Sequence, residues 1–220
     1  METFADTLDT IRRELASDDA VVRAEFLSHF TPQAEEFANH MANAVRNWRT
    51  LDAEVEGDEN RAYVSAWAYA AISLHIASMK LFLSGQMVAS GNLFRQVVET
   101  IAIALLCSTK ELNVLERFKA DKYSSKNAVR DMLRNSDRIG LIKDALASFE
   151  RSLEFYHKYS HPSQFTLATC MSFSGDGLYV GASFDDGKMD AYQKEIAGRV
   201  GLAGVFSNFI DGVKGNVAKW

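Results

Sequence analysis

The sequence contains few of the residues that interrupt helices. Its 220 residues include only two prolines, Pro32 and Pro162, and glycine is scarce before residue 174. Proline breaks a helix because it lacks a backbone N–H and has a fixed φ, and glycine weakens one through its conformational freedom. Long helices are therefore expected over most of the chain.

The sequence also has few cysteines, no net positive charge and no signal-peptide pattern, and each of these absences limits the functions or cellular locations that are expected. The two cysteines, Cys107 and Cys170, sit in apolar surroundings and match no metal or redox spacing, so both are expected to be reduced and buried. A net charge of -5 argues against general binding along a nucleic-acid backbone, although a local basic patch stays open. Residues 1–6 are acidic and lack a basic region followed by an apolar run, so no signal peptide is predicted and a cytoplasmic protein is expected.

One stretch has no charged side chain. Residues 62–79 contain no Asp, Glu, Lys or Arg and reach the length at which a membrane helix is considered. Alanine dominates this stretch, however, and Ser65, Ser73, His75 and Ser78 recur through it. A buried helix of a soluble bundle explains this composition better, because small residues allow neighbouring helices to approach closely, and no membrane association is expected.

Apolar spacing indicates where the helices lie. Phe4, Leu8, Ile11 and Leu15 recur at steps of four, three and four, which is typical of an amphipathic helix. Thr31 and Pro32 suit the cap and first position of a new helix, so one helix is expected to end and another to start there. Helices are predicted over residues 4–15, 18–30, 32–48, 61–83, 93–108, 112–119, 127–133, 137–160 and 190–213.

The pattern changes after Pro162. Leu167, Met171 and Phe173 alternate with smaller residues, residues 175–177 read Gly-Asp-Gly, and apolar residues alternate again from Leu178. Alternation on both sides of a glycine turn predicts a β-hairpin. The predicted fold class is thus mostly α, a multi-helix bundle with one short antiparallel hairpin at about 166–183. A single domain, 1–220, is expected, with N-terminal helices (1–50), a central bundle (61–160), the hairpin and a C-terminal helix (190–215).

Gly198, Gly201 and Gly204 lie within the predicted last helix. They do not follow the G-x-G-x-x-G order of a dinucleotide site, and no strand precedes them. Close packing against another helix, in the same chain or in a second subunit, explains them better. A homodimer is therefore expected.

The densest group of chemically reactive side chains lies in residues 151–161. Glu154 and His157 form half of a di-iron bundle pattern, but no second Glu-x-x-His occurs in the chain. His157 and His161 have the spacing of a zinc pair, but the catalytic glutamate is missing at the expected place. No metal and no cofactor are therefore predicted.

Arg151 and His157 form an Arg-x5-His motif. In this motif the chain resembles the helical HEPN domains, whose members include RNases that use Arg-x4-6-His across a dimer interface to cleave RNA without metal. It also looks like related bacterial helical proteins that end a long helix in a Tyr/Ser/His segment, here residues 156–163. The resemblance covers residues 60–163. It implies that Arg151 holds a phosphate, that His157 transfers a proton, and that RNA or a small anionic ligand is bound.

The same residues also allow a structural interpretation. Arg151, Glu154 and Lys158 can form a solvated helix face, while Tyr159, Ser160 and His161 end the helix. Arg95 and Glu99, spaced i,i+4 in an otherwise apolar helix, favour a site, because ionised groups there need partners. We expect the pair to lie near the segment 156–161. Together they would form a small polar ligand pocket made of Arg95, Glu99, Tyr156, Tyr159, Ser160 and His161.

Two functions remain open at this stage. One is a non-catalytic helical interaction or regulatory module with this polar pocket. The alternative is a metal-independent RNase or nucleotide-handling enzyme of HEPN type, so whether the chain is an enzyme is left undecided.

Overall fold

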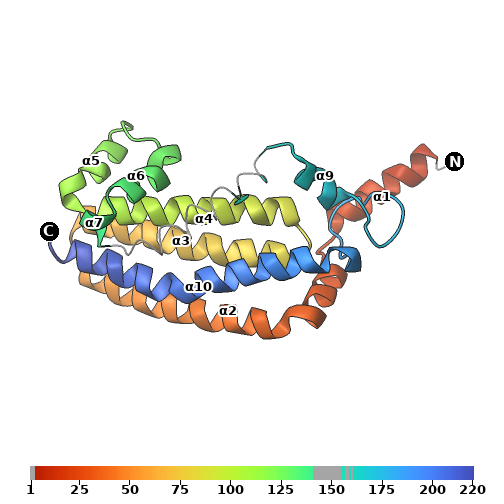
Figure 1. Ribbon diagram of the computed structural model, residues 1–220, viewed down its shortest axis with the longest axis horizontal. Coiled ribbons are helices and arrows are strands. Elements are labelled where there is room, and N and C mark those ends of the chain that lie inside the picture. The colour runs from red at the N-terminus through yellow and green to blue at the C-terminus, as the bar shows by residue number, and fades with distance from the viewer. Residues whose placement is uncertain (1–2, 141–154, 157–158, 160) are drawn as a thin grey trace.

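The computed structural model describes residues 3–140, 155–156, 159 and 161–220. Its body is built from long helices that lie side by side (Figure 1). These are α2 (Ala20–Glu54), α3 (Glu59–Leu83), α4 (Met87–Ser108) and α10 (Met189–Val217). Short elements cover α4 near one end of this bundle: α5 (Val114–Lys119), α6 (Ala128–Arg134) and α7 (Ser136–Ile139). The mostly helical prediction is confirmed.

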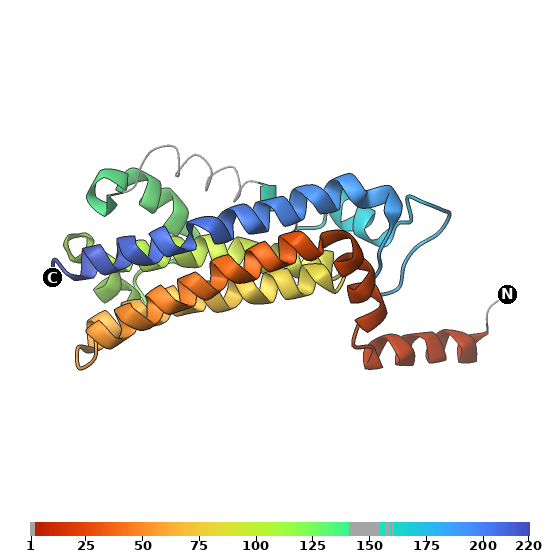
Figure 2. The same cartoon turned by 90° about the horizontal axis from the view of Figure 1, so that it is seen from below.

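The first helix is an arm that leaves the bundle. Helix α1 (Phe4–Ala16) starts with a capping box, in which the Thr3 hydroxyl accepts from the Asp6 N–H and the Asp6 carboxylate accepts from the Thr3 N–H. None of its residues is buried. Figure 2 shows it pointing away from the end of the bundle where α2 begins.

The predicted break at Thr31 is a kink within one helix. Phe30 has non-helical dihedral angles (φ -126°, ψ 15°), and α2 continues through Pro32 to Glu54. Thr31 does not cap a new helix, because its hydroxyl donates to the carbonyl of Leu27, 2.6 Å away. Proline removes one backbone donor and bends the helix, while packing of Phe26, Phe30 and Phe37 in the core keeps both halves in place.

The uncharged stretch lies in α3, which packs against α2, α4 and α10. Of the described residues, Glu59–Leu83 forms the single helix that is long and apolar enough to cross a membrane, a test that core helices of soluble proteins also pass. Its neighbour α4 is buried on nearly all sides from Val97 to Ser108. Cys107 lies in this core as predicted, whereas Cys170 is exposed and that prediction is wrong.

The predicted hairpin is wrong. Its first half is helix α9 (Gln164–Cys170), whose N-cap Ser163 accepts from the Thr166 N–H. Residues 171–183 form a loop with one isolated antiparallel bridge, Met171 to Leu178, and the described residues contain no strand. The step of four from Leu167 to Met171 fits a helix as well as it fits alternation, and the N-cap favours the helix.

Helix α10 closes the bundle and buries a stripe that includes Tyr192, Ile196, Val200, Ala203, Phe206 and Ile210. Of its three predicted packing glycines, Gly198 and Gly204 lie near Tyr156 and His40, at distances where a Cβ would make ordinary contacts of 3.5 and 3.6 Å. Gly201 faces open space. Close helix packing within the chain therefore does not require glycine at these positions.

Candidate functional site

The described residues bring together five polar side chains from three parts of the chain. Ser90 comes from α4, Glu195 and Arg199 come from α10, and Tyr156 and Tyr159 come from the segment before α9. All five are buried. We refer to these five residues as the polar cluster.

An ion pair lies at the centre of the polar cluster. The Arg199 guanidinium and the Glu195 carboxylate, 1% and 5% exposed, lie 2.5 Å apart. Tyr159 donates to one carboxylate oxygen at 2.6 Å and Tyr156 donates to the other at 3.0 Å. Arg199 also donates to the Ser90 hydroxyl. A buried charge is costly unless it is paired and hydrogen-bonded, and Glu195 meets both conditions.

Aromatic rings surround the Arg199 guanidinium. Its central carbon lies 4.9 Å from the ring centre of Phe82, 5.4 Å from that of Phe94 and 5.9 Å from that of Tyr156. Cation–π attraction partly replaces the water that burial removes. Its Nε is buried and has no hydrogen-bond partner among the described residues.

Both tyrosines stay protonated in this environment. Burial raises the pKa of Tyr156 well above its ordinary value, and the neighbouring Glu195 raises it further. Burial also raises the pKa of Tyr159, again with a contribution from Glu195. The two hydroxyls are therefore donors to the carboxylate rather than bases or nucleophiles at neutral pH.

His75 of α3 lies next to the cluster in the core. Its Nε2 lies 3.0 Å from the carbonyl oxygen of Arg199, so the ring is the tautomer that donates from Nε2. Its ring stacks on Phe206 at 5.1 Å and meets Phe37 edge-on. Burial is the main reason that the pKa of His75 falls to about 3, with the charge of Arg199 acting in the same direction. His75 is thus a neutral core residue.

Close contact between helices positions the cluster. Ser78 of α3 and Ser90 of α4 each donate to the other's carbonyl, at 3.0 and 2.9 Å. The Tyr159 ring lies directly on Gly91, where an added Cβ would come within 2.5 Å of ring carbon Cγ. The absence of a side chain at Gly91 therefore lets Tyr159 reach Glu195.

The predicted pair Arg95–Glu99 is formed, with 2.9 Å between Nε and Oε1 and about a fifth to a quarter of each side chain exposed. Gly91, Arg95 and Glu99 follow at i, i+4 and i+8, so the pair continues the row of α4 on which Tyr159 rests. Whether the pair contacts the segment 156–161 stays a prediction.

The other predicted site residues divide into three groups. Tyr156 and Tyr159 belong to the buried polar cluster, and His161 is exposed. Arg151, His157 and Ser160 lie outside the described residues, so the Arg-x5-His motif and its roles in catalysis stay predictions.

Four residues of this region were not predicted as site residues from the sequence: Ser90, Glu195, Arg199 and His75. One signal was present, because Glu195 and Arg199 are spaced i,i+4 beside the core positions Tyr192, Ile196 and Val200 of the last helix. Their partners come from residues 36 to 109 positions away in the sequence, which no local pattern predicts.

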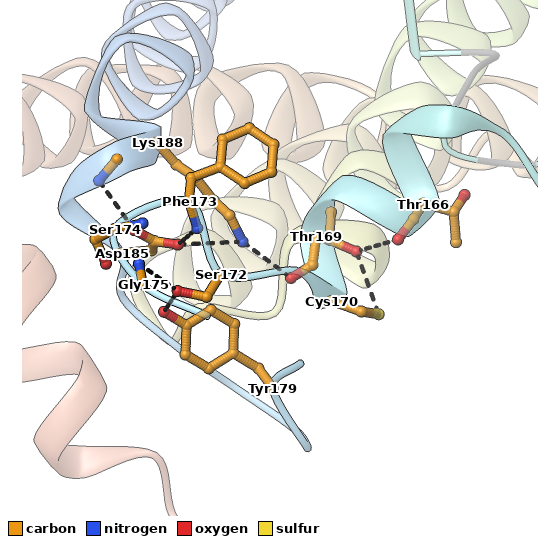
Figure 3. Close-up of polar contacts among 11 residues, drawn as sticks. Thr166, Thr169, Cys170, Ser172, Phe173, Ser174, Gly175, Tyr179, Asp185 and Lys188 are labelled. Carbon is orange, nitrogen blue, oxygen red and sulfur yellow. Dashed lines mark hydrogen bonds and ion pairs between the residues drawn. The ribbon is translucent and has the colours of Figure 1, made fainter. Parts of the chain in front are cut away.

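A second polar group holds the loop after α9 (Figure 3). Buried Asp185 accepts from the N–H groups of Phe173, Ser174 and Gly187, at 2.6, 3.1 and 2.9 Å. Burial alone would raise the pKa of Asp185, but these hydrogen bonds and the charge of Lys188 outweigh it and lower the pKa to about 2. Lys188 donates to the Thr169 carbonyl and so ties the loop to α9.

Neither group is arranged as a metal centre. Within the described ranges, no three His, Cys, Asp or Glu side chains lie close enough together to hold an ion. Comparison of the chain with family models, with curated proteins and with solved structures gives no match. In the polar cluster and the Asp185 group, the buried charged side chains are engaged by other groups of the chain, so both groups stabilise structure.

Proposed function

We propose that this chain is a cytoplasmic helical interaction module that self-associates as a homodimer. One observation carries the proposal: large apolar side chains of α9 and of the loop after it are exposed at the same end of the bundle. We call these residues the apolar end surface; they are Leu167, Met171, Phe173, Leu178 and Val180.

The apolar end surface is exposed to an unusual degree. Leu178 is 74% exposed, Leu167 64% and Phe173 56%. Single exposed apolar residues are common on proteins, but a group of them close together is typical of a contact surface. All five fall within fourteen residues of the chain, so one partner can cover them together.

The structure beneath this surface supports a binding role. The Asp185 carboxylate accepts a hydrogen bond from the Phe173 N–H of the loop. The Lys188 ammonium lies 5.5 Å from the Phe173 ring centre and 5.1 Å from that of Tyr179. A loop held in one conformation loses little entropy when a partner binds, which favours affinity.

Light scattering of Leu178→Asp tests the proposal. The wild-type chain should have about twice the 24.5 kDa mass of one chain, and Leu178→Asp should shift it toward one chain, because a buried carboxylate costs several kcal/mol. Val205→Asp is the control, since Val205 is also exposed but lies on α10 away from this end. A wild-type mass of 24.5 kDa at high concentration would refute the homodimer.

The polar ligand pocket is a separate part of the proposal. Its support is the Arg95–Glu99 pair, which stays part-exposed on the row of α4 that carries Tyr159. Arg95→Ala should destabilise the fold by leaving Glu99 without this counter-charge. His157→Ala should leave the fold nearly intact and abolish binding of RNA or a small anion, or RNA cleavage if the HEPN-type alternative holds. Unfolding of His157→Ala would contradict both roles.

A further inference from the structure

Among the described residues, an exposed helix and an apolar groove form two further surfaces of similar length. One is the arm α1, whose stripe of Phe4, Leu8, Ile11 and Leu15 projects from the bundle (Figure 2). Phe4 and Leu15 are 82% and 83% exposed. Anchors at steps of four, three and four are typical of a helix that docks its apolar face in a groove.

The second surface is a groove between α2 and α3. It has a volume of about 640 Å³, and Phe37, Met41 and Met79 line it together with Ala34, Ala38, Ala42, Ile76 and Leu83. Small side chains along α2 leave room there for another helix. A smaller hollow of about 190 Å³ shares Val45, Arg49 and Ile76 with it and extends it toward Tyr69, which is 46% exposed.

The groove and the arm have the same length. Helix α1 has 13 residues and is about 20 Å long at about 1.5 Å per residue. Apart from Arg23, the residues of α2 that line the groove run from Ala34 to Arg49, which is about 22 Å on the same scale. The arm can therefore fill the groove from end to end.

The first half of the arm has the opposite charge to the groove. The charged side chains that line the groove are all cations: Arg23, Arg49 and Lys80. The first two turns of the arm carry Asp6 and Asp9 and no cation, whereas its second half carries Arg12, Arg13 and Glu14. Across the roughly 8 Å over which charges act at physiological salt, this favours the approach of arm and groove.

The arm of the same chain is too short to occupy this groove. Only residues 17–19 separate α1 from α2, so an arm folded back would run along α2 from residue 20. Its 13 residues would then end near residue 33, so the arm would reach Arg23 at one end of the groove but not the part from Ala34 to Arg49. The Glu14 carboxylate also accepts from the Ala182 N–H at 3.2 Å, which ties the base of the arm to the loop at the bundle end.

We propose that α1 of a second copy of this chain docks in the groove between α2 and α3, so that two copies exchange arms. The inference rests on the proposed self-association and specifies how it occurs. Two docked helices about 20 Å long and about 10 Å wide, buried on both partners, remove on the order of 1,000 Å² from water. That area is at the lower limit for a specific interface, so burial of the apolar end surface is needed as well.

Cysteine cross-linking between two different variants tests the exchange. Cys170 is first replaced by Ser; Cys107 can stay, because burial raises the pKa of its thiol to about 12. One chain then carries Ile11→Cys at the middle of the arm and the other carries Ala42→Cys at the middle of the groove, so either helix direction brings the two close. After mixing and mild oxidation, a disulfide-linked pair of the two variants is expected on a non-reducing gel. Ala197→Cys, exposed on α10, replaces Ala42→Cys in the control and should give at least tenfold less product.

The outcomes separate this inference from self-association itself. If the wild type is a dimer but Ile11→Cys does not link to Ala42→Cys above the control, arm exchange is wrong and the homodimer stands. If Ile11→Cys and Ala42→Cys link only when both are in one chain, the arm docks on its own bundle and the exchange is again wrong. If the wild type is a monomer in light scattering, both proposals fail.

A charge in the arm gives a second measurement. Ile11→Glu places a carboxylate in the apolar stripe and should raise the dimer dissociation constant at least tenfold. Thr10→Glu adds the same charge about 100° around the helix from Ile11, off the stripe, and should leave the constant nearly unchanged. Equal effects of the two changes would overturn the docking of the stripe.

Discussion

At the scale of single residues, His75 links the stability of the fold to pH. The folded pKa of about 3 lies below the ordinary value of 6.5, mainly because the ring is buried. Between these values the unfolded chain binds a proton that the folded chain excludes, so stability is lost as pH falls below 6.5. Relative to pH 8, the free energy of unfolding should fall by about 2 kcal/mol at pH 5 from this group alone.

Urea unfolding at several pH values measures this loss. His75→Phe keeps an aromatic ring beside Phe206 but loses the hydrogen bond to the Arg199 carbonyl, so this variant should be less stable at pH 8. Because phenylalanine cannot take up a proton, the variant should lose less stability on acidification. The exposed histidines His29 and His161 are present in both proteins and contribute equally. A pH dependence of His75→Phe as steep as that of the wild type would contradict the assignment.

The Glu195–Arg199 pair is also a residue-scale feature. Arg199→Met should cost about 3–5 kcal/mol of unfolding free energy, because Glu195 stays buried without its counter-charge. Glu195→Gln combined with Arg199→Met should recover part of that loss, since no buried charge remains. Lys119→Met, which removes the exposed pair with Glu59, should cost at most about 1 kcal/mol. Urea unfolding measures these losses of unfolding free energy. Similar losses at the two pairs would be inconsistent with a buried Glu195–Arg199 pair.

At the scale of elements, glycines in two helices should respond in opposite ways to alanine. Gly91→Ala should destabilise by about 1–3 kcal/mol, because the new Cβ meets the Tyr159 ring that lies on α4. Gly201→Ala on α10 should stabilise by up to about 1 kcal/mol, since its Cβ would face open space and alanine favours the helix. Thermal unfolding of the two variants checks the contrast, which would be absent if Tyr159 were not seated on Gly91.

At the scale of the whole molecule, two proposed contacts would hold the dimer together: the docked arms and the apolar end surface. A dimer held by them should unfold at a higher temperature when the protein is more concentrated, because association stabilises the folded state by mass action. Calorimetry over a hundredfold range of concentration tests this. Ile11→Glu should reduce the dependence and Thr10→Glu should keep it; a wild-type unfolding temperature independent of concentration would argue against association.

The amino-acid sequence by itself determined the long helices. Periodic apolar residues and the scarcity of proline and glycine are local signals, so α3 and α10 were predicted nearly in full and α4 from residue 93 onward, without its first six residues. It also marked Tyr156 and Tyr159 as site candidates and Arg95–Glu99 as a pair. The roles proposed for Arg151 and His157 still rest on the sequence alone.

Only the tertiary structure decided the rest, because it depends on contacts between distant residues. Continued packing on both sides of Pro32 turned a predicted helix end into a kink. Helix α9 is an exception, because its N-cap Ser163 is a local signal that the prediction of a strand from short apolar alternation overlooked. The polar cluster forms because α4, α10 and the segment before α9 meet in the folded chain. Each of these parts alone resembles an ordinary helix face.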